Sequence, residues 1–161
     1  MLRSFLIGLV AGQRGISPLA VIAIATYRRE IPAELPLQKL MLNPAVTAGV
    51  TALAAAEMAG DKMKSAPDRI VPIGLFVRAI TSAYAGAALA PREHRAAGAV
   101  VAMGTALVSS YFGWRLRMAA MERYGQTSTG LVEDAVVFGT GLAVANPQLT
   151  GTRALMPPAQ R

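Results

Sequence analysis

Residues 57–78 read EMAGDKMKSAPDRIVPIGLFVR, and this stretch joins two apolar runs through a compact charged turn. Glu57 lies in the last turns of an alanine-rich run, and Arg78 lies inside the next apolar run. Between them, Gly60-Asp61-Lys62 and Pro67-Asp68-Arg69 form the turn. Ionisable residues within apolar runs are costly in a bilayer, so they usually face the protein interior. The stretch therefore predicts a helical membrane protein with buried charges.

The composition supports the same class of protein. The 161 residues are 53% hydrophobic and 16% charged, with a mean hydropathy of +0.42. Soluble domains average about 45–50% apolar and about 25% charged residues. The net charge of +7 comes from basic residues spread over all the clusters between apolar runs, which favours contact with lipid headgroups over nucleic acid. A soluble helical bundle is the alternative.

Motifs for catalysis or metal binding are absent from the sequence. There is no cysteine, a single histidine at His94, no Gly-x-Ser-x-Gly and no His-Glu-x-x-His. Ser109 and Ser110 have no histidine base at a workable spacing, and serines within membrane helices usually bond to backbone carbonyls. We therefore expect no catalytic activity, no cofactor and no metal.

The apolar runs define about five hydrophobic segments of an all-α, polytopic membrane helical bundle. The segments are residues 2–27, 40–60, 70–90, 96–114 and 130–146. Gly12, Gly15 and Pro18 weaken a continuous helix in the first segment, which is therefore broken or re-entrant, with Arg14 near the break. We expect one domain over residues 1–147 and a disordered tail over 148–161.

Local signals refine these segments. Asn43-Pro44 is typical of a helix start, and Glu122 to Thr129 reads as a polar loop. Glu133-Asp134 would then lie in the first turn of the last segment, where acidic residues favour the helix dipole. Tyr111, Phe112 and Trp114 resemble an aromatic belt, with Arg115 and Arg117 as basic anchors at the membrane surface.

Small residues at four-residue spacing predict close helix contacts, either within the chain or in a homo-oligomer. One such stripe is Ala52, Ala56 and Gly60, and the other is Gly98, Ala102 and Ala106.

A weak internal repeat relates the first and third segments. Ile7-Gly8-Leu9-Val10 matches Ile73-Gly74-Leu75-Phe76, and Arg14-Gly15-Ile16-Ser17 matches Arg78-Ala79-Ile80-Thr81. Chance matches are common in a chain this rich in Ala and Gly. A true duplication would give each half one helix break and one arginine, which is a feature of transporter binding sites.

Seven charged residues lie within or at the edge of the apolar segments and form the hypothetical ligand-binding site. They are Arg14, Glu57, Asp61, Lys62, Arg78, Glu133 and Asp134. The arginines could bind an anion, because the guanidinium fork suits phosphate or carboxylate. Glu57 and Asp61, four residues apart, could share a proton or bind a cation. Alternatively, the charges form structural pairs, such as Arg14 with Glu57 or Arg78 with Glu133, or they extend to the membrane surface.

Four stretches together resemble a family of small bacterial integral membrane proteins catalogued as a domain of unknown function. They are Gly12 to Pro18, Ala56 to Lys62 with Pro67-Asp68-Arg69, Arg78 to Ala90, and Leu131 to Ala135. The resemblance covers most of residues 1–146 and implies a helical inner-membrane protein, without implying an activity. It also makes the charged residues named above the first site to test.

Two functions follow as hypotheses. The first is a small transporter or channel for a small solute, with an anion as one candidate class, and with a polar centre at the helix breaks. The second is a non-transporting membrane scaffold whose buried charges are structural ion pairs and whose Gly/Ala faces bind a partner helix. Five spans would place seven basic residues on each side of the bilayer, so the positive-inside rule gives no orientation.

Overall fold

The computed structural model describes residues 1–62 and 71–149. In these ranges the elements are α1 (Leu2–Gln13), α2 (Ser17–Tyr27), α3 (Pro36–Leu40), α4 (Pro44–Gly60), α5 (Pro72–Leu89), the 3-10 helix η1 (Arg92–His94), α6 (Arg95–Tyr124) and α7 (Gln126–Ala145). No strand is formed there, so the expected all-α fold is confirmed. The predicted turn at Pro67-Asp68-Arg69 and residues 150–161 of the predicted tail lie outside the described residues.

Three helical stretches are long and apolar enough to cross a membrane. They are Pro72–Leu89, Arg92–Tyr124 and Gln126–Ala145. With 12 and 11 residues, α1 and α2 extend about 18 and 16 Å at a rise of about 1.5 Å per residue, well short of a ~30 Å hydrocarbon core. α4, with 17 residues, is one residue shorter than α5 and is not among these three stretches. The described residues thus give three candidate spans, and the expectation of about five is not confirmed.

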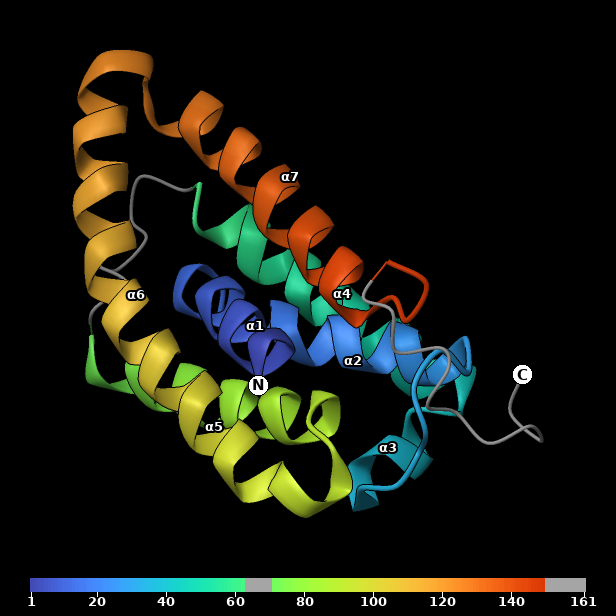
Figure 1. Cartoon of the computed structure of the whole chain (residues 1–161). Helices are drawn as coiled ribbons and strands as arrows, with labels where there is room; N and C mark the ends of the chain where they lie inside the picture. Colours follow the sequence, from blue (N-terminus) through green and yellow to red (C-terminus); the bar gives the residue numbers. More distant parts are fainter. Residues whose placement is uncertain (63–70, 150–161) are drawn as a thin grey trace.

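The short helices α1 and α2 form the centre of the molecule. Figure 1 shows both of them, in blue, enclosed by the longer helices. α1 packs mainly on α6, and α2 packs on α4, α7 and α5. α2 is apolar on every side, and Val21, Ile22 and Ala23 are fully buried. A helix without a polar face is expected in the interior, so the break expected near Arg14 lies inside the protein.

One of the two predicted small-residue stripes forms a helix contact. A Cβ placed on Gly98 of α6 would lie 2.5 Å from the Cβ of Ala90 and 2.7 Å from the carbonyl oxygen of Gly86 in α5. Ala102 and Ala106, further along the stripe, are fully buried. The glycines therefore let α5 and α6 approach until their backbones are in contact, as predicted.

The other stripe lies on the outside of α4. Ala52 and Ala56 are exposed, and a Cβ placed on Gly60 would meet no atom within 4 Å. The α4 residues buried in the fold are instead Thr47 and Ala54. The prediction that this stripe forms a helix contact is therefore wrong within the described chain.

The connection between α6 and α7 is much shorter than predicted. Glu122 to Thr129 was expected as a polar loop, but α6 continues to Tyr124 and α7 begins at Gln126. Gly125 alone joins them with a φ of +79°, a conformation that glycine adopts without a Cβ clash. Consequently Glu133 and Asp134 lie two turns inside α7. Their predicted placement in its first turn is wrong.

The internal repeat does not extend to a second helix break. α5 runs without interruption from Pro72 to Leu89, through Arg78. By contrast, the matching residues Arg14, Gly15 and Ile16 lie between α1 and α2. The two segments therefore differ at the feature that would have made them equivalent halves.

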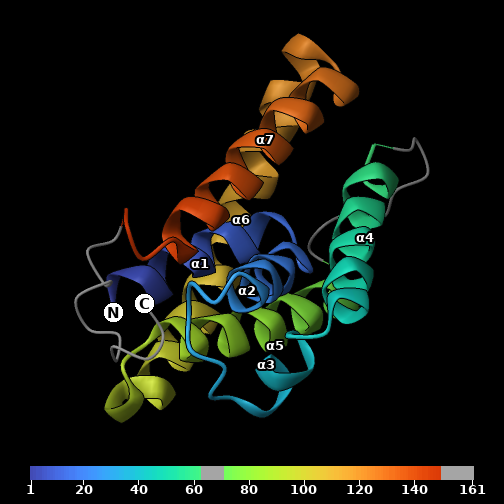
Figure 2. The same ribbon diagram turned by 90° about the vertical axis from the view of Figure 1, so that its right-hand side faces the viewer.

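Polar contacts hold α3 beneath the helices. The buried side chain of Gln38 accepts hydrogen bonds from the backbone N–H groups of Glu34 and Leu35, at 3.2 and 2.9 Å. The Glu34 carboxylate is also bound by Arg92 of η1, in the turn between α5 and α6, and by Arg95, the first residue of α6. In Figure 2 this turn and α3 lie at the bottom, and the α6–α7 turn lies at the top.

Candidate functional site

Side chains from two other helices bind the peptide groups at the break between α1 and α2. The backbone N–H groups of Gly15 and Ile16 donate to the two carboxylate oxygens of Glu57, at 2.7 and 2.8 Å. The hydroxyl of Thr81, on α5, lies 2.6 Å from the carbonyl oxygen of Gly15. These three backbone groups at the break are thus paired inside the protein, where an unpaired polar group would be costly.

The position of Glu57 matches the electrostatics of the break. Ile16 is the N-cap of α2, so its N–H and that of Gly15 lie at the positive end of the helix dipole. Helix N-termini bind anions through such free N–H groups. In this structure the anion is a carboxylate of the protein itself, supplied by α4.

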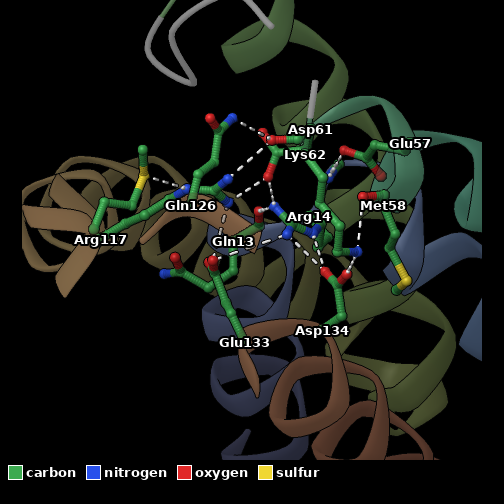
Figure 3. A network of polar contacts seen from close by, with 12 residues as sticks. Gln13, Arg14, Glu57, Met58, Asp61, Lys62, Arg117, Gln126, Glu133 and Asp134 are labelled. Atoms are coloured by element: carbon green, nitrogen blue, oxygen red, sulfur yellow. Dashed lines mark hydrogen bonds and ion pairs between the residues drawn. The ribbon is translucent and has the colours of Figure 1, made fainter. Parts of the chain in front are cut away.

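Arg14 connects the break to carboxylates on two further elements. Its side chain is 1% exposed, and Nη1 lies 2.5 Å from Oδ2 of Asp61. Nη2 lies 2.6 Å from Oδ1 of Asp134 and 3.8 Å from Oε2 of Glu133. Figure 3 shows this guanidinium between Asp61, at the end of α4, and the two acidic residues of α7. The interrupted helix is therefore tied to α4 and α7 through one buried arginine.

Two more basic residues complete this network. Arg117 of α6 contacts the Asp61 carboxylate, and its Nη1 lies 3.1 Å from Oε2 of Glu133. Lys62 binds the Asp134 carboxylate and donates to the carbonyl oxygen of Met58 at 3.1 Å. We call the set the charged cluster. It comprises Arg14, Asp61, Lys62, Arg117, Glu133 and Asp134.

The charged cluster is balanced. It contains three cationic and three anionic side chains, and each contacts at least one partner of opposite sign. An unbalanced buried charge would cost several kcal/mol, so this pairing makes the cluster tolerable in the interior. The pairing draws together the ends of α1 and α4, the last turns of α6 and the second and third turns of α7.

Arg78 borders the break from the side of α5. It is 6% exposed, and its Cγ lies 3.5 Å from the position that a Cβ would occupy on Gly15. The same Cβ would lie 3.3 Å from Oε1 of Glu57. The missing side chain of Gly15 therefore lets a carboxylate and an arginine stem approach the break together.

The structure brings all seven predicted site residues to the break or to the charged cluster, but it changes their partners. The predicted pair of Arg14 and Glu57 is wrong, because Arg14 binds Asp61 and Asp134 while Glu57 binds backbone N–H groups. Glu57 and Asp61, which were expected to share a proton or bind a cation, bind different groups, because Glu57 accepts from the backbone of the break and Asp61 pairs with Arg14 and Arg117. The interpretation of Glu133-Asp134 as residues that only favour the helix dipole fails as well, because both bind cations.

Sequence reasoning missed Arg117. It was interpreted as an anchor at the membrane surface, yet its side chain is only 7% exposed. Arg117 follows the buried Ser110 by seven residues, which is two helical turns, and so shares its face of α6. Ending the predicted helix at Trp114 hid this relationship.

The remaining candidate groups have structural partners. The hydroxyl of Ser110 donates to the carbonyl oxygen of Ala106 at 2.7 Å, and that of Ser109 lies 3.3 Å from the same oxygen. Among residues 1–62 and 71–149, no group of three or more His, Asp or Glu side chains is arranged to hold a metal ion.

No protein-family model, no curated protein and no solved structure matches the chain.

Proposed function

We propose that the protein is a multi-pass protein of the bacterial inner membrane and that the α1–α2 break is the solute-binding site of a transporter or channel for a small anionic solute. We call this site, formed by the backbone N–H groups of Gly15 and Ile16, the seat. One observation carries the proposal, namely that the Glu57 carboxylate already accepts hydrogen bonds from both of these N–H groups. Transporters with discontinuous helices bind the anionic groups of their substrates at such helix ends. In this proposal Glu57 closes the seat, and a solute carboxylate or phosphate replaces it.

A movement of α4 could exchange Glu57 for a solute at the break. α4 carries both Glu57 and Asp61, and it packs mainly against α2. A displacement of its C-terminal end would empty the seat and separate Asp61 from Arg14. The incoming anion would then compensate Arg14 and the neighbouring Arg78.

The proposal includes a re-entrant arrangement of α1 and α2. Arg3, near the start of α1, donates to the carbonyl oxygens of Val144 and Ala145 at the end of α7. Arg14, just after α1, meets Asp134 in the first half of α7. α1 therefore runs antiparallel to α7 towards the charged cluster, and α2 leads away from the break to α3.

A scaffold is the second candidate function, and the balance of the charged cluster favours it. Arg14 and Arg117 are both neutralised by carboxylates of the chain, as expected for structural ion pairs. In that case the exposed Ala52 and Ala56 face of α4 would bind a partner helix or a second copy.

The two candidates are separated by ligand-dependent melting of the detergent-purified chain. Succinate, phosphate and chloride would each be titrated against the wild type, Glu57→Gln and the control Glu122→Gln, an exposed carboxylate on α6. The transporter proposal expects succinate or phosphate to raise Tm, and Glu57→Gln to lower the half-saturating concentration by about tenfold, because the competing carboxylate is gone.

The scaffold alternative predicts a different result. None of the three anions would change Tm in either the wild type or Glu57→Gln, and native mass spectrometry would show a second copy retained. That combination would remove the support for a binding seat. Circular dichroism of each variant verifies that it remains helical.

A further inference from the structure

The end of the molecule around α3 exposes basic and apolar side chains together. The basic side chains belong to Arg28 and Arg29 at the end of α2, Lys39 on α3 and Arg92 on η1. The exposed apolar side chains are Tyr27, Leu37, Leu40 and Leu42. We call this set of eight residues the α3 surface.

The fold fixes which side chains of the α3 surface point outward. Gln38 is 1% exposed and holds α3 through its bonds to the backbone N–H groups of Glu34 and Leu35. Because Gln38 occupies the buried side of this single helical turn, Leu37 and Leu40 lie on its exposed side. Leucines beside basic residues at the end of a helical bundle are typical of segments at the lipid interface.

Charge separates this end of the molecule from the end that carries the charged cluster. Near α3 the described basic residues are Arg3, Arg28, Arg29, Lys39, Arg92 and Arg95, against the acidic residues Glu30, Glu34 and Glu93. Near the break and the charged cluster the described basic residues are Arg14, Lys62, Arg78, Arg115, Arg117 and Arg123, against Glu57, Asp61, Glu122, Glu133 and Asp134. Within the described residues both ends thus carry six basic residues, but the larger net positive charge lies at the α3 end, where four basic side chains are exposed against two at the other end.

We propose that the α3 surface binds the headgroups of anionic phospholipids and that this end faces the cytoplasmic leaflet. Basic side chains near a membrane surface are attracted to anionic lipid, and basic residues accumulate on the cytoplasmic side. Leu37 and Leu40 insert at the boundary between headgroups and acyl chains. The two ends carry equal numbers of described basic residues, and the fold distinguishes them by exposure. Arg28, Arg29, Lys39 and Arg92 are exposed, whereas Arg14, Lys62, Arg78 and Arg117 are buried or half-buried.

The lipid preference is tested by binding of the detergent-purified full chain to mixed micelles with phosphatidylglycerol or with phosphatidylcholine alone. The variant Arg28→Gln/Lys39→Gln is compared with Arg115→Gln/Arg123→Gln, which removes two exposed basic residues at the other end. At about fivefold for each basic residue, the first variant should bind phosphatidylglycerol micelles roughly 30-fold more weakly at low salt, and the second should be nearly unchanged.

Two results would overturn the lipid proposal. One is equal binding of the wild type to both kinds of micelle. The other is an equal loss in both variants, which would indicate attraction by net charge alone. Raising the salt concentration should abolish the preference in the wild type, because exposed charges are screened over a few ångströms at about 1 M.

The orientation is tested by cysteine labelling, since the chain contains no cysteine of its own. Lys39→Cys and Arg123→Cys each place one thiol at an exposed position, at opposite ends of the molecule. A membrane-impermeant maleimide added to intact spheroplasts should label Arg123→Cys, and it should label Lys39→Cys only after permeabilisation. Labelling of Lys39→Cys in intact spheroplasts, or no labelling of Arg123→Cys, would overturn the orientation.

Discussion

The carboxylate of Glu57 accepts a hydrogen bond from the backbone N–H of Gly15 at 2.7 Å, across 42 residues of sequence. This contact attaches α4 to the central helices α1 and α2, because Glu57 of α4 accepts the hydrogen bonds of the backbone N–H groups at the start of α2. The stability of the break therefore depends on Glu57, a side chain from outside the break.

Replacing Glu57 by alanine should destabilise the protein by about 2–6 kcal/mol. The change leaves the N–H groups of Gly15 and Ile16 without their acceptors, at about 1–3 kcal/mol for each buried group. The measurement is the free energy of unfolding in mixed detergent and SDS micelles. Glu122→Ala is the control, with an expected change within about 0.5 kcal/mol. Equal effects of the two substitutions would contradict the assigned role of Glu57.

The pairing of Arg14 with Asp134 should appear as a coupling energy. Arg14→Ala alone should cost about 3–5 kcal/mol, because Asp61 and Asp134 lose a buried counter-charge. The double variant Arg14→Ala/Asp134→Ala should be less destabilised than the sum of the single variants, by about 1–3 kcal/mol. Simple additivity in this double-mutant cycle would show that the contact carries no energy.

The sequence predicted the members of the site better than their partners. The cost of an ionisable residue in an apolar run applies to each residue singly, so the pattern identified Arg14, Glu57 and Asp61 without any knowledge of the fold. Partners depend on which helix ends meet. That depends on α6 extending to Tyr124 and on the one-residue connection at Gly125, and neither follows from hydropathy.

The expectation of about five spans was not confirmed, for a related physical reason. Hydropathy does not distinguish a helix that faces lipid from one that is surrounded by protein, since both are apolar. α2 is the clearest case, because it is apolar on all sides and yet buried among α4, α5 and α7. The glycines around Arg14 correctly indicated the break, but the matching position in α5 has Ala79 and remains helical.

The contact of α5 with α6 should be sensitive to one methyl group. Gly98→Ala would place a Cβ 2.7 Å from the carbonyl oxygen of Gly86, so the helices must separate, at a cost of about 1–3 kcal/mol. Gly104→Ala, six residues along α6, meets no atom within 4 Å and should leave stability unchanged or slightly higher. Thermal unfolding of both variants distinguishes them, and a similar Tm for the two would contradict the close approach.

The Glu34 carboxyl should make the stability of the folded protein depend on pH. Hydrogen bonding from Arg92, together with the charges of Arg92 and Arg95, lowers the pKa of the Glu34 carboxyl below its ordinary value. The folded state therefore binds this proton less readily than the unfolded state. The stabilisation is complete above the unfolded pKa of about 4.3 and is lost as the pH falls through the lower folded pKa.

The check is the difference in Tm between the wild type and Glu34→Gln from neutral pH to about pH 3. The difference should be largest at neutral pH and should shrink below about pH 4. Glu93→Gln, an exposed carboxyl on η1, is the control. A difference that stays constant across this range would show that the ionisation of Glu34 does not contribute.

Arg117 and Arg115 should differ sharply although they are two residues apart on α6. Arg117 binds Asp61 and Glu133 in the interior, so Arg117→Ala leaves uncompensated buried carboxylates and should cost about 3–5 kcal/mol. Arg115 is exposed and lies over the ring of Tyr111 at 5.5 Å, a contact worth about 0.5–1 kcal/mol. Unfolding free energies of the two alanine variants measure the contrast. Equal small effects of the two substitutions would contradict the buried position of Arg117 and its pairing with Asp61 and Glu133.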